Sequence, residues 1–308
     1  MRVTGPERAR LSQRAAIASV VMALTLLIAK SWAAIATDST AMLGSLADTG
    51  LDLIASIMTL VGVRIAALPA DHDHRFGHGK AEALVALGQV VLITISALGI
   101  GWRAIDRLIH GAETANPEIG IGVSIFAIAS TLLLLSYQRR VIARTGSVAI
   151  KTDNLHYSSD LYLNGAVIAA LIIDHFLRVP GADAAFGVAI AGWLLWGAWQ
   201  AAGDSVDQLM DAEWPVEKRE AFLAACGDYP ELKGIHDVRT RTSGVHDFIQ
   251  FHVWVPEDWT VRQAHDKLDR VEEDLQRRFP GTEILLHLDP EGHTDREGML
   301  PHHLTERR

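Results

Sequence analysis

Two apolar stretches of the sequence each carry ionisable residues four positions apart, namely Asp48 with Asp52 and His156 with Asp160. Residues four apart share one face of a helix. Acids inside an apolar span are costly and normally face a bundle interior or a water-filled path. Imidazole with carboxylates suits a divalent first-row metal, with zinc the default, and these groups also titrate. The pattern therefore predicts a site that exchanges metal for protons.

Two other interpretations of these four residues remain open. One is a buried, hydrogen-bonded structural cluster, although structure alone does not need so many such groups on two spans. The other is a proton relay for an organic substrate, which requires the carboxylates but gives no reason for the histidine.

A second group lies in the segment 71–80, where three histidines and two aspartates fall within eight residues. This density predicts a metal site, and a solvated polar loop is the alternative. A third group lies near the C-terminus and comprises His236, Asp237, His246, His252, His265, His287 and Asp289. His287 and Asp289 are two apart near a strand end and share a face. Histidines scattered over a surface are the alternative here.

The composition shows what must position these groups. The chain has 308 residues and is 49% hydrophobic, which excludes disorder, and its single cysteine excludes a disulfide scaffold and a cysteine-based zinc site. The net charge of −9 argues against nucleic acid as a partner. From Asp204 onward the chain holds 13 Lys and Arg against 23 Asp and Glu, so the acidity belongs to the last third.

The first two thirds of the chain contain six runs long enough to cross a bilayer as helices. They are residues 15–37, 41–63, 83–102, 119–138, 154–173 and 184–203. The first run is interpreted as an uncleaved helix rather than a signal peptide, because its apolar stretch is long and more spans follow. Arginine and lysine concentrate before span one, between spans two and three, and between spans four and five. The positive-inside rule then places both termini in the cytoplasm.

Beyond Asp204 the pattern becomes that of a small soluble domain. A helix over 215–226, with Pro215 at its first position, is followed by strands over 234–242 and 247–255. A charged amphipathic helix over 260–279 and a strand over 283–288 complete the order α-β-β-α-β. This order predicts an open α+β sandwich with helices on one sheet face.

Several motifs together resemble a known family. They are Ser45-Leu46-Ala47-Asp48, Phe76-Gly77-His78-Gly79-Lys80-Ala81-Glu82, Leu155-His156-Tyr157-Ser158-Ser159-Asp160, His236-Asp237-Val238-Arg239-Thr240-Arg241 and Gln263-Ala264-His265. Over residues 11–289 the chain resembles the cation diffusion facilitators, and among them the bacterial ferrous-iron/zinc efflux branch. The resemblance implies a cytoplasmic segment (1–10), a six-helix transmembrane domain (11–206), a cytoplasmic, metallochaperone-like metal-binding and dimerisation domain (207–290) and a flexible tail (291–308).

The resemblance also implies three metal sites. The transport site matches Asp48, His156 and Asp160; Gly44 stands where close relatives carry a fourth ligand, and Asp52, one turn further along, is a possible substitute. The loop site matches Asp71, His74 and His78. The cytoplasmic binuclear site at the dimer interface matches His236, His252, His265, His287 and Asp289. Lys80 and Asp211 match an ion pair between the two domains.

The function expected from this resemblance is secondary active transport rather than catalysis. We expect a homodimer in the bacterial inner membrane that exports Zn(II), or another divalent ion, in antiport with protons. A carrier mainly for Fe(II), Cd(II) or Mn(II) is one alternative, and a membrane metal sensor that does not transport is another. A membrane metalloenzyme is a third class, but no His-Glu-x-x-His, Gly-x-Ser-x-Gly or phosphate-loop motif is present.

Overall fold

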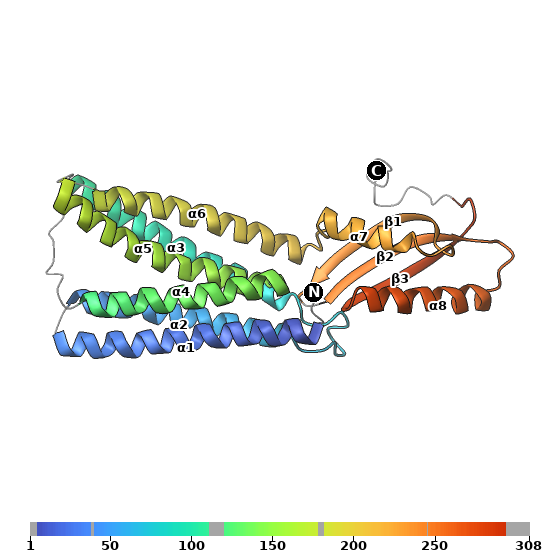
Figure 1. Cartoon of the computed structure of the whole chain (residues 1–308), viewed down its shortest axis with the longest axis horizontal. Helices are drawn as coiled ribbons and strands as arrows, with labels where there is room; N and C mark the ends of the chain where they lie inside the picture. The colour runs from blue at the N-terminus through green and yellow to red at the C-terminus, as the bar shows by residue number, and fades with distance from the viewer. Residues whose placement is uncertain (1–4, 38–39, 111–119, 178–181, 245, 294–308) are drawn as a thin grey trace.

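Six long helices lie side by side, and a small α+β domain extends from one end of the bundle (Figure 1). The structure is a computed structural model that describes residues 5–37, 40–110, 120–177, 182–244 and 246–293. The long helices are α1 (Gly5–Thr37), α2 (Thr40–Ala66), α3 (Ala81–His110), α4 (Gly120–Thr145), α5 (Val148–Leu177) and α6 (Ala182–Leu209). The predicted six-helix bundle is confirmed. The predicted tail lies outside the described residues from position 294 onward.

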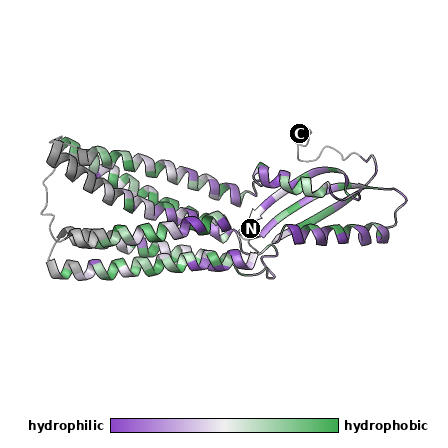
Figure 2. Ribbon diagram, viewed as in Figure 1, coloured by the Kyte–Doolittle hydropathy of each residue, from purple (hydrophilic) through white to green (hydrophobic). Residues whose placement is uncertain are grey.

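The bundle has the composition of a membrane domain. Within the described residues, four stretches are long and apolar enough to cross a bilayer: Gly5–Trp32, Thr49–Ala66, Ala81–Asp106 and Ala185–Leu209. Hydrophobic colouring runs along the helices, and hydrophilic residues gather at the end nearest the soluble domain (Figure 2). Helices satisfy their own backbone hydrogen bonds, which is what a segment surrounded by lipid requires.

Small residues allow the membrane helices to pack closely. Ala15, Ala16 and Ala97 are fully buried between helices, and Gly197 on α6 lies against Leu155 on α5. A Cβ added at Gly197 would lie 2.8 Å from a methyl group of Leu155, so an alanine there would force the Leu155 side chain to move. Lipid tails are as apolar as the side chains, and tight packing of small residues is therefore a main source of helix association in a membrane.

The soluble domain follows the predicted order. Its elements are α7 (Val216–Cys226), β1 (Lys233–Ser243), β2 (His246–Val255), α8 (Val261–Arg278) and β3 (Thr282–Pro290). The sheet order is β1-β2-β3, with β1 and β2 antiparallel and β2 and β3 parallel. Pro215 precedes α7 as its N-cap, so the prediction that it is the first helical residue is wrong by one position. Thr260 and Gln263 form a capping box that begins α8.

One face of the sheet carries the domain core and the other faces away from both helices. Ile249, Phe251 and Val253 on β2 are buried against α7 and α8, with Phe222 and Leu275 among the helix residues they meet. Side chains alternate along a strand, so His252 lies on the opposite face. The predicted sandwich, with helices on a single face, is therefore confirmed.

The loop between α2 and α3 joins the bundle to the soluble domain. The guanidinium of Arg241 on β1 lies between the rings of Phe76 and Phe248, 4.4 and 4.3 Å from their centroids. Gly79 touches the β1–β2 turn so closely that an added Cβ would lie 2.2 Å from the carbonyl oxygen of Ser243. The two domains therefore meet through close backbone contact as well as through side chains.

Candidate metal centres

A histidine and two carboxylates meet between α2 and α5 inside the bundle. One ligand atom from each of Asp52, His156 and Asp160 lies within 4.8 Å of the others. His156 Nε2 is 3.0 Å from Asp52 Oδ1, and the two side chains are only 8% and 13% exposed. Two carboxylates and an imidazole in this arrangement can bind a divalent metal or hold protons at the same atoms.

The packing around the cluster fixes the position of His156. Tyr157 is buried, and its hydroxyl lies 2.8 Å from Ser56 Oγ on α2 and donates to the carbonyl oxygen of Ser19 on α1. Ser159 Oγ donates to the carbonyl oxygen of His156. These bonds hold this turn of α5 against α1 and α2, so the imidazole faces Asp52 rather than lipid.

The structure brings together part of the residue set predicted for the transport site. His156 and Asp160 are brought together as expected, and Asp52, the possible substitute, completes the group. Positions 44 and 48 both belong to α2, but position 44 is glycine and the side chain of Asp48 lies outside what the structure describes. Asp48 is one turn from Asp52 on the same helix face, which leaves it as a candidate fourth ligand.

The loop group is compact and organised by its own backbone. Asp71 Oδ1 accepts hydrogen bonds from the N–H groups of Asp73 and His74, at 3.0 and 2.7 Å. His74 Nδ1 and His78 Nε2 each lie 3.3 Å from a carboxylate oxygen of Asp71. The N–H of His74 holds the pKa of Asp71 below its ordinary value, so this carboxylate is ionised at neutral pH.

The second nitrogen of His78 has a partner of its own. His78 Nδ1 lies 3.2 Å from the carbonyl oxygen of Pro69, an acceptor that assigns the proton to Nδ1 and leaves the Nε2 lone pair directed at the group. A backbone carbonyl bonded to the far nitrogen is the usual support for a metal-binding histidine. Asp71, His74 and His78 fit a divalent metal, and all three are the residues predicted from the sequence.

The third group lies on the open face of the soluble sheet. His236, His252 and Asp289 offer ligand atoms within 4.8 Å of one another. His252 Nδ1 is 2.8 Å and His236 Nε2 is 3.4 Å from Asp289 Oδ2. The strand register explains the grouping, because His252 pairs with His236 across β1–β2 and with His287 across β2–β3.

Two residues change the predicted membership of this third group. His287 Nε2 is 3.6 Å from Asp289 Oδ1, so this histidine lies at the edge of the cluster. His265 is exposed on α8, whose buried side chains pack on the other face of the sheet, and it is not part of the group. Asp237 belongs to the third group in the sequence but not to the binuclear set implied by the resemblance, and its Oδ2 lies 3.7 Å from His252 Nε2.

The predicted ion pair between the domains is in contact. Lys80 Nζ lies 3.1 Å from Asp211 Oδ2 and donates to the carbonyl oxygen of Leu209 at 3.0 Å. Arg241 approaches the other oxygen of Asp211 at 3.5 Å. Asp211 thus joins the end of α6, the start of α3 and β1 at one point.

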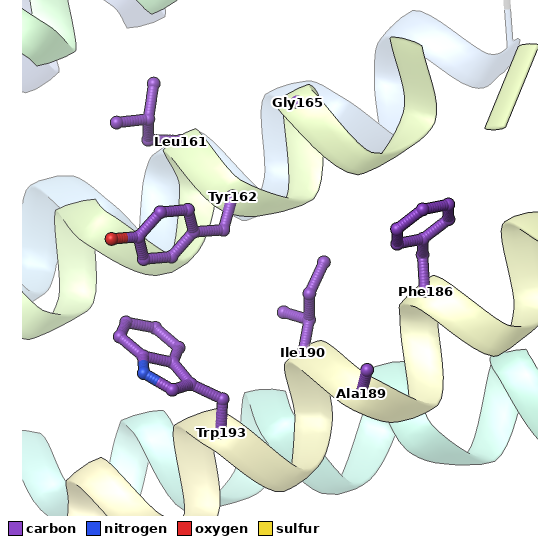
Figure 3. Close-up of a pocket in the computed structure, with 7 residues that line it drawn as sticks. All are labelled: Leu161, Tyr162, Gly165, Phe186, Ala189, Ile190 and Trp193. Carbon is purple, nitrogen blue, oxygen red and sulfur yellow. The ribbon is translucent and has the colours of Figure 1, made fainter. Parts of the chain in front are cut away.

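An apolar pocket of about 600 Å³ lies between α5 and α6, next to Asp160 in the sequence (Figure 3). Its walls include Leu161, Tyr162, Phe186 and Trp193. The rings of Tyr162 and Trp193 meet edge to face, with their centroids 4.7 Å apart. These side chains offer no carboxylate or imidazole, so the pocket is not a cation site.

Two family models match successive parts of the chain. The cation efflux transmembrane domain matches residues 16–210, and the cytoplasmic domain of cation efflux proteins matches residues 214–291.

Individual relatives agree with this match over nearly their full length. The chain is 40% identical to the cation-efflux pump FieF of Serratia proteamaculans, over 92% of this chain and 95% of the relative. It is 40% identical to FieF of Escherichia fergusonii, over 94% and 96%. A solved structure of CzrB in its zinc form covers 27% of this chain and 97% of its own at 32% identity, with a TM-score of 0.26.

Proposed function

The chain belongs to the cation efflux family, and we propose that it exports Zn(II) from the cytoplasm in exchange for protons. As a member of that family it is a multi-pass inner-membrane transporter of divalent metal cations. The proposal adds the metal, the counter-ion and the residues that carry them.

The observation that carries the proposal is the group of Asp52, His156 and Asp160 inside the membrane bundle. Two carboxylates and one imidazole supply three ligands for a tetrahedral zinc ion. The fourth position is open to Asp48 or to water. Gly44 has no side chain to offer, and Asp52 compensates by bringing a carboxylate from one turn beyond Asp48 to within 3.0 Å of His156.

Proton exchange follows from the chemistry of the same atoms. His156 Nε2 is hydrogen-bonded to Asp52, so a metal that binds this nitrogen must displace the proton shared between them. Zinc entering from the cytoplasm would release protons there, and protons arriving from the other side would release the zinc. Helix rocking that exposes the site to each side in turn completes the cycle.

The orientation and assembly are also part of the proposal. The N-terminal end of α1 and the soluble domain lie at the same end of the bundle, since Arg8 is 3.6 Å from Asp247. The arginine-rich loops mark that end as cytoplasmic. We propose that two chains pair through their cytoplasmic domains, with the helix-free sheet face at the interface.

The other two groups suit resident metals. Asp71, His74 and His78 would hold a metal beside the domain junction, and His236, His252, His287 and Asp289 would hold metal on the open sheet face. A metal at either place supplies positive charge that cross-links neighbouring segments. His265 joins the second set only if a second protomer brings α8 to this face.

Liposomes loaded with a fluorescent zinc indicator test the function. We expect zinc flux in the wild type, and its loss in Asp160→Ala, which removes one ligand. Gly44→Asp restores a carboxylate at the vacant position, and we expect it to change the rate or the preferred metal. Full flux in Asp160→Ala would contradict the site. Silence toward zinc, cadmium, manganese and ferrous iron in the wild type would instead favour a metal sensor.

A further inference from the structure

A fully buried carboxylate, Asp153, joins five of the membrane helices one turn before His156. Its Oδ2 accepts a hydrogen bond from Ser19 Oγ on α1 at 2.6 Å and from Gln138 Nε2 on α4 at 2.7 Å. Its Oδ1 accepts longer bonds from Thr59 Oγ1 on α2 and Gln89 Nε2 on α3, both at 3.3 Å. Every donor is uncharged and comes from a different helix.

The hydrogen bonds to this carboxylate come from no cation, and His156, one turn along α5, acts on Asp153 only through space. Among the described residues, no lysine, arginine or histidine forms an ion pair with Asp153. A buried charge without a partner is expensive, and such groups neutralise by taking up a proton. Neutral donors alone offset only part of that cost.

The geometry also accommodates a protonated Asp153. Ser19 Oγ is 3.2 Å from the carbonyl oxygen of Ala15, and Thr59 Oγ1 is 3.1 Å from that of Ala55. Each hydroxyl can turn its hydrogen to its own helix and accept one from the carboxyl group. Gln89 Oε1, in the same network, is buried without a hydrogen-bond partner. It is a further acceptor for a proton carried by Asp153 once the side chains rearrange.

We propose that Asp153 is a proton-binding residue of the transport reaction, distinct from the metal ligands, and that zinc at the cluster of Asp52, His156 and Asp160 expels its proton. The inference rests on the proposed function. A doubly charged ion one helical turn away stabilises the ionised carboxylate, whereas an empty cluster leaves the neutral acid. The step converts the carboxylic acid to a carboxylate and one proton, which leaves to water when the cytoplasmic half opens. By linkage, a proton on Asp153 weakens zinc binding equally.

The groups that face Asp153 make its contribution separable. Along α5 these are His156 and Tyr157, and α2 adds Asp52. Of the residues whose side chains the structure describes, α1, α3 and α4 bring the uncharged Ser19, Gln89 and Gln138 to this carboxylate. Protons released by the ligands themselves are common to the wild type and to any Asp153 variant. A difference between the two therefore reports Asp153.

Proton release on zinc binding is the direct test, using the full chain in detergent with a pH-sensitive dye. The protons that Asp160→Ala still releases on zinc addition give the contribution of the loop and soluble-domain groups. Above that level, we expect Asp153→Asn to release up to one proton fewer per zinc than the wild type. A fall of one pH unit should also weaken zinc binding by up to about tenfold less in this variant than in the wild type, because one fewer proton competes with the metal.

Two further variants separate titration from structure. Thr59→Val removes a donor to the same carboxylate but no titratable group, so we expect lower stability with the wild-type proton count. The double variant Gln89→Glu with Asp153→Asn exchanges the amide and the carboxylate. It returns a carboxylate to the network, so zinc binding should again release the proton that Asp153→Asn alone does not release. If the exchange leaves the count at the level of Asp153→Asn, a titrating role for this network is overturned.

The outcomes distinguish this inference from the proposed function. Absence of cluster-dependent proton release in the wild type would overturn the proposed exchange itself. Release that is equal in the wild type and Asp153→Asn would overturn the role of Asp153 alone. If Asp153→Asn does not fold, infrared spectra of the wild type decide: zinc should remove a neutral-acid C=O band that Thr59→Val shifts. A band that is missing, or that Thr59→Val leaves unchanged, would contradict the inference.

Discussion

Among single residues, Asp52 is the one on which the proposed membrane site of this chain most depends. It supplies a carboxylate oxygen 3.0 Å from His156 Nε2, and its side chain is 13% exposed. Position 44 holds glycine, so the acidic character of α2 at this site depends on Asp48 and Asp52.

Replacing Asp52 tests that assignment at the residue scale. We expect Asp52→Asn to weaken zinc binding at the cluster by at least about tenfold, the loss seen even for groups that only support a ligand. Isothermal titration of zinc into the full chain measures the change. Asp106→Asn, an exposed aspartate on α3, is the matched control and should leave binding unchanged. Equal affinities in the two variants would remove Asp52 from the site.

The single cysteine offers a second test at this scale. Cys226 is fully buried in the soluble domain, and burial raises the pKa of its thiol to about 12. The neutral thiol is favoured in the folded state, so its stabilising contribution is complete below the ordinary pKa and declines as the pH rises toward 12. We expect a maleimide to label Cys226 at pH 8 only after unfolding. Rapid labelling of the folded protein would contradict the packing of α7.

At the level of elements, the loop between α2 and α3 carries both a candidate metal group and the contact with the soluble domain. His78 belongs to the metal group, and Gly79 and Lys80 follow it immediately. Phe76, in the same loop, packs against Arg241 on β1. A metal bound at this loop would therefore act on the same short segment that contacts the soluble domain.

Gly79→Ala tests how tightly this segment is packed. A Cβ there would lie 2.2 Å from the carbonyl oxygen of Ser243, so the loop or the turn must move. We expect a cost of about 1–3 kcal/mol, as for other overpacked sites, seen as a lower unfolding temperature. Gly203→Ala on α6 meets nothing within 4 Å and is the control; it should be neutral or slightly stabilising. Equal unfolding temperatures would contradict the close contact.

The sequence predicts some of these elements well for physical reasons. The long apolar runs predict the six helices, and alternation with turn residues predicts the three strands. The soluble-domain cluster is predicted by the family resemblance rather than by spacing, and the structure explains it: His236, His252 and His287 occupy registered positions on neighbouring strands. His265 shares the residue type but not the face, since the helix phase directs it to solvent.

The Asp153 network could not be read from the sequence. Its donors Ser19, Thr59, Gln89 and Gln138 lie on four different helices, and no local spacing relates them. Each one alone resembles an ordinary polar residue in a membrane helix. Only the packing of the bundle brings them to one carboxylate. Long-range polar networks of this kind are specified by tertiary structure rather than by periodicity.

At the scale of the whole molecule, the three groups lie in successive parts of the structure. The membrane cluster lies on α2 and α5 of the bundle, the loop group lies between α2 and α3, and the third group lies on the strands of the soluble domain. Figure 1 shows the soluble domain at one end of the bundle. The contacts of Lys80 with Asp211 and of Arg8 with Asp247 fix the soluble domain to the helices. A metal bound in the cytoplasmic domain would therefore act, through these contacts, on the helices that carry the candidate transport site.

Simultaneous measurement of zinc and proton movement in the same vesicles tests the central claim most directly. Purified protein would be reconstituted with indicators for both ions, and a pH gradient would be imposed in each direction. The account predicts that zinc moves against the proton flow, reverses with the gradient and stops in Asp160→Ala. Zinc flux that is indifferent to the gradient, or proton flow without zinc, would contradict it.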